Sequence, residues 1–291
     1  MSLKFFAWNV QGCGNPRFLL AARHFLRENK PDHVGILEQR VSGLRADSII
    51  AALGFHRSHR VKAIGNSGGI WLCWNSSVEI TILYSHFQFI HCQVSFPNSS
   101  FFLASIVYGT PKAAKRRSLW SGLRYITRNI TSSWIILGDF NATLSSSDRM
   151  GCASLKHNKD FQDFLWDLSL RDKGFHGPNY TWSRSTAQVR LDCCLCNSYW
   201  DECFPKSSIL HLLRMRSDHR PIFLQVEGTE KNLSKAHLRN FSGWLSHDDF
   251  TRMVCDNWTP GPSLSEIIRS FTMAADVWNT TLVTSELRNI S

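Results

Sequence analysis

Acidic, amide and histidine side chains follow the apolar runs of this sequence at several separate places. The run Trp134–Leu137 is followed by Gly138, by Asp139 and, two residues later, by Asn141. Asp and Asn are common turn formers, so either of them could simply end a strand. In an extended segment, side chains two positions apart point to the same face, so both could also act on one phosphate group. Comparable groups stand at or near the ends of other runs: Asn9, Glu38, Tyr108, Asp192, Ser217, Asp218 and His219.

This set of side chains suits the hydrolysis of a phosphodiester. A hard divalent cation takes oxygen ligands, which Glu38 and nearby Asp or Asn residues would supply, and it offsets negative charge in the transition state. Asp139 could orient or deprotonate a water molecule, and His219 could give a proton or a charged hydrogen bond to a phosphate oxygen. Asp192 could hold the His219 ring, as carboxylates do in other hydrolases.

Net charge and cysteine usage limit the class of protein. The 291 residues carry 33 Lys and Arg against 23 Asp and Glu, which gives a net charge of +10. This surplus favours a polyanionic partner such as nucleic acid. The nine cysteines have no framework spacing and the N-terminus carries no secretory signal, so we expect a reduced, intracellular compartment. No apolar run approaches the length of a transmembrane helix, and the sequence leaves the oligomeric state open.

The elements that must position these groups follow from the apolar periodicity. A helix is expected from Pro16 to about Glu28, with Asn15 as its N-cap, and further helices over 111–128 and 160–168. Strands are expected over 4–10, 33–37, 69–74, 78–84, 87–96, 101–108, 134–137, 180–183, 189–195 and 222–226. This order predicts a mixed α/β domain with two packed sheets and helices outside them.

The composition changes after Val226. Residues 227–238 are polar and are expected to form a linker, and two helical segments are expected around 247–257 and 263–284. We therefore predict a domain over residues 1–226 and a linker with a helical appendage over 227–291.

Motifs in a fixed order give the sequence a specific resemblance. They are W-N-V-Q-G-C-G-N-P (8–16), P-D-H-V-G-I-L-E-Q-R (31–40), G-G-I-W-L-C-W (68–74), V-Y-G-T-P (107–111), L-G-D-F-N-A-T-L-S-S-S-D-R (137–149), G-P-N-Y-T-W-S (177–183), R-L-D (190–192) and S-D-H-R-P (217–221). The chain resembles the endonuclease/exonuclease/phosphatase superfamily, and within it the endonuclease domain of plant LINE retrotransposons. The resemblance implies a deoxyribonuclease-I-like fold, a four-layer α/β sandwich with two central mixed β-sheets. It also implies cleavage of phosphoester bonds with Mg²⁺ or Mn²⁺, and in the LINE branch the nicking of one DNA strand to prime reverse transcription.

Carried over by motif, the resemblance assigns a role to each site residue. Glu38 resembles the main metal ligand, Asn9 a second residue on the metal side that also contacts substrate, and Asp218 a group near the metal or behind the Asp192–His219 pair. The other roles are Tyr108 at the scissile phosphate, Asp139 activating water, Asn141 at the transition state, Asp192 with His219 engaging the phosphate, and Thr181 and Ser217 as phosphate-contacting hydroxyls.

The tail adds to the resemblance. The segments F-S-G-W-L-S-H-D-D-F (241–250) and W-N-T-T-L (278–282) resemble the connector between endonuclease and polymerase in plant LINE polyproteins. The sequence contains no polymerase motif, so a reverse transcriptase would have to come from another chain. DNA as the substrate implies a nuclear location.

One departure from the family pattern and several alternatives remain open. Cys193 stands where the family has Arg after R-L-D, which would remove a cationic contact. The chain could therefore be an inactive nucleic-acid-binding relic of a retrotransposon. It could also be an abasic-site or small-substrate phosphoesterase of the same superfamily. A zinc site is a further alternative with poor ligand spacing, on Cys193, Cys196, Cys203 and His211.

Overall fold

The computed structural model describes residues 2–63, 68–96, 100–127, 130–151, 159–227, 248–257 and 274. The chain divides into two compact units, Met1–Lys231 and Asn232–Ser291. In the second unit the structure describes α6 (Asp248–Asn257), which agrees with the helix expected around 247–257. The helix expected over 263–284 falls outside the described residues, apart from Ala274. In the described part of the chain, no helix is long and apolar enough to cross a membrane.

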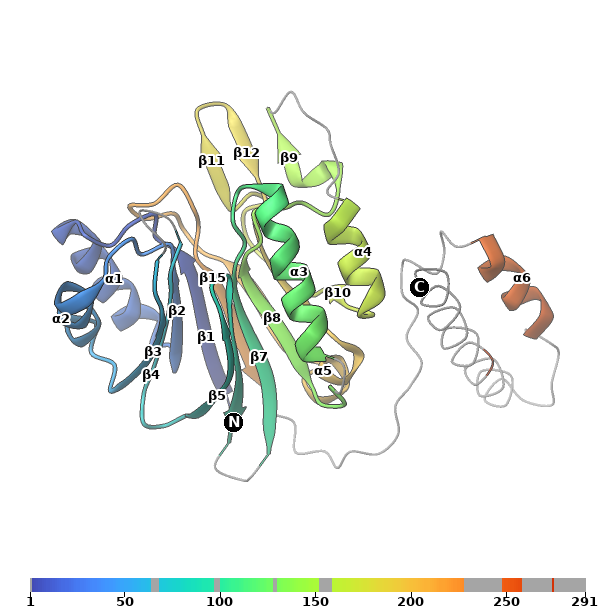
Figure 1. The fold of residues 1–291 in the computed structure, drawn as a ribbon, viewed down its shortest axis with the longest axis horizontal. Coiled ribbons are helices and arrows are strands. Elements are labelled where there is room, and N and C mark those ends of the chain that lie inside the picture. The colour runs from blue at the N-terminus through green and yellow to red at the C-terminus, as the bar shows by residue number, and fades with distance from the viewer. Residues whose placement is uncertain are drawn as a thin grey trace. The chain divides into compact units, whose positions relative to one another are not determined.

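The first six-stranded sheet of the first unit has the order β14-β15-β1-β2-β4-β3. Its strands are β1 (Ser2–Asn9), β2 (His33–Leu37), β3 (Arg57–Val61), β4 (Ile70–Trp74), β14 (Ser208–His211) and β15 (Ile222–Glu227). β1 and β2 are parallel, and α1 (Pro16–Asn29) is the crossover between them. The other neighbours are antiparallel. Helix α2 (Gly43–Leu53) packs beside α1 on the outer face (Figure 1).

The second six-stranded sheet has the order β10-β13-β8-β7-β6-β5. Its strands are β5 (Glu79–His86), β6 (Phe89–Ser95), β7 (Phe101–Tyr108), β8 (Trp134–Asp139), β10 (Arg171–Asp172) and β13 (Asp192–Cys196). Here β7 and β8 are the parallel pair, and α3 (Ala113–Thr127) is the crossover. Helix α4 (Lys159–Asp167) lies beside α3, and the short helix α5 (Ser198–Cys203) follows β13.

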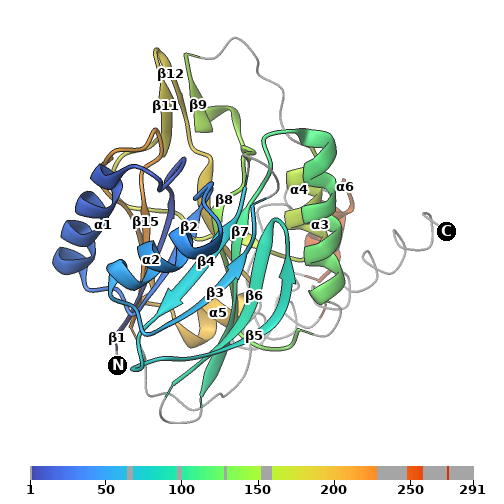
Figure 2. The ribbon, with the colours of Figure 1, turned by 60° about the vertical axis from the view of Figure 1, so that its left-hand side comes forward.

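A small third sheet extends beyond the ends of the large ones. It consists of β9 (Arg149–Met150), β11 (Trp182–Arg184) and β12 (Ala187–Val189), after a 3-10 turn, η1 (Ser146–Asp148). In Figures 1 and 2 this sheet projects at the top of the molecule, past the ends of β1 and β8.

Three apolar layers hold the first unit together. Phe5 and Phe6 follow each other in β1 and enter different layers, because successive strand side chains point to opposite faces. Phe5 lies in the cluster between the sheets, and Phe6 lies against α1 and α2. A third cluster, with Trp120 of α3 and Phe164 of α4, covers the other outer face. The layers therefore run helices, sheet, sheet, helices (Figure 1), and the expected four-layer sandwich is confirmed.

The two parallel pairs bring polar residues to one edge of the sandwich. β1 ends at Asn9, and β2 is followed by Glu38. In the other sheet β7 ends at Tyr108 and β8 ends at Asp139. Ligand and catalytic sites of α/β proteins gather at such strand ends, so the fold concentrates these residues in one region.

Candidate active site

Tyr108, Asp139 and Asp192 occupy neighbouring positions on three adjacent strands. Tyr108 pairs with Asp139 across β7 and β8, and Asp192 pairs with Asp139 across β13 and β8. The position before Asp139 requires glycine. Gly138 has a φ of 137°, and a Cβ atom there would lie 2.2 Å from the Val107 carbonyl oxygen. Only glycine adopts this backbone without strain.

Asn9 connects the two sheets at the site. Its Nδ2 donates to Glu38 Oε2 at 3.0 Å and to Asp139 Oδ2 at 2.8 Å. Its Oδ1 accepts from the Gln11 backbone N–H at 3.0 Å, which fixes the amide plane. All three interacting side chains of this group are buried. One amide nitrogen therefore holds two carboxylates from different sheets beside each other.

Glu38 stands in an uncommon backbone conformation and carries a cationic neighbour. Its φ is 53°, the left-handed region that residues other than glycine seldom occupy. Its carboxylate is ion-paired with Arg40, whose Nε donates to Oε1 at 3.0 Å. Sequence reasoning assigned Arg40 no role. The available signal was a cation placed two residues after the expected metal ligand.

Asn141 holds the Asp139 carboxylate from the other side. Its backbone N–H donates to Asp139 Oδ1 and its Nδ2 donates to Asp139 Oδ2, both at 2.8 Å. The same Nδ2 also donates to the Gly109 carbonyl at 2.8 Å. Asn141 has a φ of 49°, which Asn tolerates better than most residues. The segment is thus both a turn that ends β8 and a device that orients the carboxylate.

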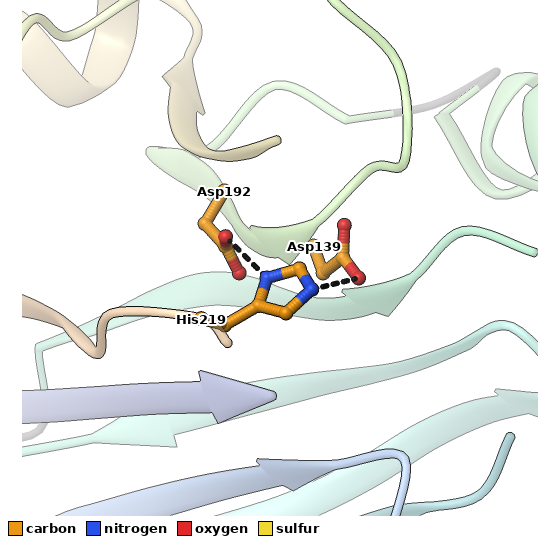
Figure 3. Close-up of side chains that lie close together, drawn as sticks. All are labelled: Asp139, Asp192 and His219. Carbon is orange, nitrogen blue, oxygen red and sulfur yellow. Dashed lines mark hydrogen bonds and ion pairs between the residues drawn. The ribbon is translucent and has the colours of Figure 1, made fainter. Parts of the chain in front are cut away.

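His219 lies between two aspartates (Figure 3). Its Nδ1 is 2.8 Å from Asp192 Oδ2, and its Nε2 is 3.9 Å from Asp139 Oδ2. All three side chains are at most 5% exposed. The arrangement fixes the ring by one nitrogen and directs the other toward Asp139.

The charges of His219, Asp192 and Asp139 shift the pKa values of His219 and Asp139. Burial lowers the pKa of His219, but Asp192 and Asp139 outweigh it and bring the pKa to about 9. Burial also raises the pKa of Asp139 to about 7, against the opposing effect of the His219 charge. At neutral pH His219 is therefore cationic, and Asp139 is close to the pKa that suits a general base.

Two other expected site residues support this group through the backbone. Thr181 is fully buried, and its Oγ1 accepts from the Leu191 and Asp192 N–H groups at 3.0 Å each. Ser217 Oγ donates to the Asn9 carbonyl at 2.8 Å and accepts from the His219 N–H at 3.1 Å. These bonds position Asp192 and His219, while the expected phosphate contacts of both hydroxyls stay predictions.

Asp218 lies at the same edge and is bonded to Gln11 and Trp182. Its Oδ2 accepts from Gln11 Nε2 at 2.8 Å and from Trp182 Nε1 at 2.9 Å. Trp182, which sequence reasoning gave no role, also forms a backbone bridge with His219. Asp218 thus ties the small sheet to the site, and its metal role stays a prediction.

Cys193 follows Asp192 but points away from the site. It is buried in the outer cluster beside α3 and α4, on the opposite face of β13 from its neighbour Cys194, which lies between the sheets. Two residues before Asp192, Arg190 is ion-paired with Asp148 and Asp172. Arg190 therefore places a paired cation next to this strand, two residues before Asp192.

The oxygen atoms near Asn9 suit a hard divalent cation. Oxygens of the Glu38 and Asp139 carboxylates both accept from Asn9 Nδ2, and carboxylate oxygen is the ligand type that Mg²⁺ and Mn²⁺ favour. By spacing alone, Asp139, Asp192 and His219 also form a possible metal group. His219 Nδ1 is already engaged by Asp192, and a pKa of about 9 favours the protonated ring, which cannot be a metal ligand. The position of the cation stays a prediction, with Glu38 as its expected main ligand. Among the described residues, Cys193, Cys196, Cys203 and His211 form no such group.

Residues 6–219 match the model of the Endonuclease/Exonuclease/phosphatase family. The match covers more than half of the chain, and the chain belongs to this family. Members of the family are divalent-metal-dependent hydrolases that act on phosphodiesters or phosphate esters. A search of curated proteins found no match.

Solved structures share the fold at low sequence identity. An AP endonuclease, LMAP from Leishmania major, superposes with a TM-score of 0.61 at 18% identity, covering 78% of this chain and 88% of that one. The endonuclease domain of TRAS1, a telomere-specific non-LTR retrotransposon, gives 0.59 at 12% identity, with 78% and 98% covered. The 3′ phosphatase NExo from Neisseria, bound to a product DNA hairpin, gives 0.56 at 19% identity, with 77% and 99% covered.

Proposed function

We propose that this chain is a Mg²⁺- or Mn²⁺-dependent DNA endonuclease that nicks one strand. The observation that carries the proposal is the convergence of Glu38 and Asp139 on Asn9 beside the Asp192–His219 pair. One side of the site offers oxygen ligands to a cation, and the other offers a buried positive charge. A phosphodiester placed between them would meet a cation on each side.

The chain's own residues would divide the reaction between them. Asp139, oriented by Asn141 and poised near neutral pH, takes a proton from the attacking water. His219, held by Asp192, gives a charged hydrogen bond to a phosphate oxygen. Tyr108, adjacent to Asp139 in the sheet, is assigned to the same phosphate. Glu38 would hold the divalent ion, which supplies electrostatic stabilisation of the transition state, and Asn9 would keep the Glu38 carboxylate in position.

We further propose that the enzyme is of the LINE retrotransposon type and acts in the nucleus. The ordered motifs and the tail segments 241–250 and 278–282 support this assignment. The fold shared with the TRAS1 endonuclease domain is compatible with it. In this setting, the 3′-hydroxyl at the nick would prime a reverse transcriptase supplied by another chain.

Nicking of a supercoiled plasmid tests the proposal. The wild type with Mg²⁺ should convert supercoiled DNA to open circles, and Asp139→Asn should lower the rate by about a thousandfold. Asp47→Asn is a matched control, because this aspartate is exposed on α2 and ion-paired only with Arg60. Absence of metal-dependent nicking by the wild type, with DNA binding retained, would support the inactive relic instead.

A second substrate separates the endonuclease from a repair enzyme. The same assay should be run on one duplex with and without an abasic site. Comparable rates on the two duplexes are expected for a retrotransposon-type nuclease. A rate on the abasic duplex far above that on the intact one would instead favour an abasic-site phosphoesterase.

A further inference from the structure

Two arginines on the segment between β14 and β15 lie beside the active site and have no anionic partner among the described residues. Arg214 Nη1 donates to Ser183 Oγ of β11. Arg220 directly follows His219, and its Nη1 donates to the Leu212 carbonyl at 3.4 Å. Its backbone N–H donates to the Thr181 carbonyl at 2.6 Å. Both arginines are therefore held against the strand that also carries Trp182.

The hydrogen-bonding capacity of these arginines is only partly used. The Nε atoms of Arg214 and Arg220 are both covered from solvent and have no hydrogen-bond partner among the described residues. Neither guanidinium forms an ion pair within the described part of the chain, whereas the buried Arg190 pairs with two aspartates. The nearby Asp218 instead accepts from Gln11 and Trp182. Covered donors without partners are uncommon in folded proteins and call for a ligand.

The two positive charges also act on each other. Burial, and after it the charge of Arg214, lowers the pKa of the Arg220 guanidinium. Holding two like charges together without a counter-ion destabilises the folded protein, and an anion between them would remove that cost. Guanidinium groups recognise phosphate through paired N–H donors.

The position of the pair relative to His219 identifies the anion. Arg220 is the next residue after His219, and Arg214 is held by Ser183, next to the Trp182 that bridges to His219. A DNA strand with its scissile phosphate at His219 would carry further phosphates along this flank. Building on the function proposed above, we propose that Arg214 and Arg220 together bind a backbone phosphate of the DNA strand, at a linkage other than the scissile one.

Binding measurements without cleavage test this assignment. Duplex DNA is titrated in EDTA with the wild type and with the double variant Arg214→Gln/Arg220→Gln, whose side chains remain polar but carry no charge. We expect the double variant to bind about tenfold more weakly, with the slope of log K against log salt reduced by about one. Arg124→Gln is the matched control, since Arg124 lies near the C-terminal end of α3 and is paired with Asp167; it should bind as the wild type does.

Neutral methylphosphonate linkages, placed one at a time in the duplex, locate the phosphate. We expect one linkage flanking the nick site at which the substitution weakens wild-type binding severalfold and leaves the double variant unaffected. Identical profiles for the two proteins would overturn the arginine assignment while leaving the endonuclease intact. If the double variant does not fold, the wild type alone decides. Equal wild-type affinity for every singly substituted duplex would also overturn the arginine assignment. Failure of the wild type to bind DNA at low salt would overturn both proposals.

Discussion

Arg40 is ion-paired with Glu38, the carboxylate expected to be the main metal ligand. Arg40 occupies Oε1, while Asn9 donates to Oε2. Both oxygens of the carboxylate are therefore engaged by this chain's own donors. A divalent cation that binds Glu38 must share it with the Arg40 guanidinium, whose side chain is 40% exposed.

Arg40→Gln should therefore strengthen binding of the divalent cation. The substitution removes a positive charge near the cation, while Asn9 still holds the other oxygen of Glu38. A repulsion of about 1 kcal/mol at a partly exposed site corresponds to roughly fivefold in affinity. Titration of free Mn²⁺ by electron paramagnetic resonance would measure the change in the protein without DNA. Weaker binding by the variant would mean that Arg40 orients Glu38 rather than competing for it.

Asp192→Asn should shift the alkaline limit of activity to lower pH. Asp192 is the strongest of the influences that raise the pKa of His219. The wild type keeps the charged ring below about pH 9 and loses it as the pH rises through that value. Without the Asp192 charge, this loss begins at lower pH, and the plateau rate falls by about a hundredfold or more. The measurement is the nicking rate across pH. An unchanged alkaline limb would show that another group sets it.

Gly138→Ala should destabilise the fold strongly. A Cβ atom would meet the Val107 carbonyl oxygen at 2.2 Å, in a backbone with a φ of 137°. We expect a loss of about 3 kcal/mol or more in the free energy of unfolding, from strain and from the displaced strand. Gly54→Ala is the comparison, because Gly54 also has a positive φ but its Cβ would meet nothing within 4 Å; about 1 kcal/mol is expected there. Equal losses in urea denaturation would contradict the argument.

His33→Leu should protect the protein against acid. His33 is fully buried against the Phe5 ring, and neither ring nitrogen has a hydrogen-bond partner among the described residues. Burial lowers its pKa from 6.5 to about 3. Below pH 6.5 the unfolded chain therefore binds a proton at His33 that the folded protein does not bind. The free energy of unfolding falls as the pH drops from 6.5 toward 3. The penalty is about 1.4 kcal/mol per pH unit.

Unfolding curves at pH 7 and pH 5 would measure this effect. The wild type should lose about 2 kcal/mol more than His33→Leu between the two conditions. His56→Leu is a suitable control, because His56 is exposed and its replacement should leave the wild-type pH dependence in place. Equal losses in the wild type and His33→Leu would show that His33 is not the acid-sensitive group.

Four strands that carry the site, β1, β2, β7 and β8, were predictable because each is an apolar run that ends in a polar group or is followed by one. The edge strand β3 was not, because its sequence, Arg57–Val61, is polar and mostly exposed and depends on pairing with β4. Helix α2 was also missed, although Gly54 in the left-handed region marks its end. The strand expected over 189–195 is divided into β12 and β13.

The division of that strand has a cause that lies outside its own segment. The Arg190 backbone N–H donates to the Asp148 carbonyl, and its side chain pairs with Asp148 and Asp172. These partners are distant in sequence, so local periodicity could not reveal the break. Arg40 was missed for a different reason, because its pairing with Glu38 accompanies left-handed backbone at both residues, which the sequence pattern does not show.

Asn9 belongs to one sheet and Asp139 to the other, yet a single hydrogen bond of 2.8 Å joins them. The approach of the Glu38 and Asp139 carboxylates therefore depends on how one sheet of the sandwich packs against the other. A small sliding of the sheets would separate Glu38 from Asp139 while every strand ladder stayed intact. On gradual denaturation, metal affinity should therefore decline before the β-sheet signal in circular dichroism does.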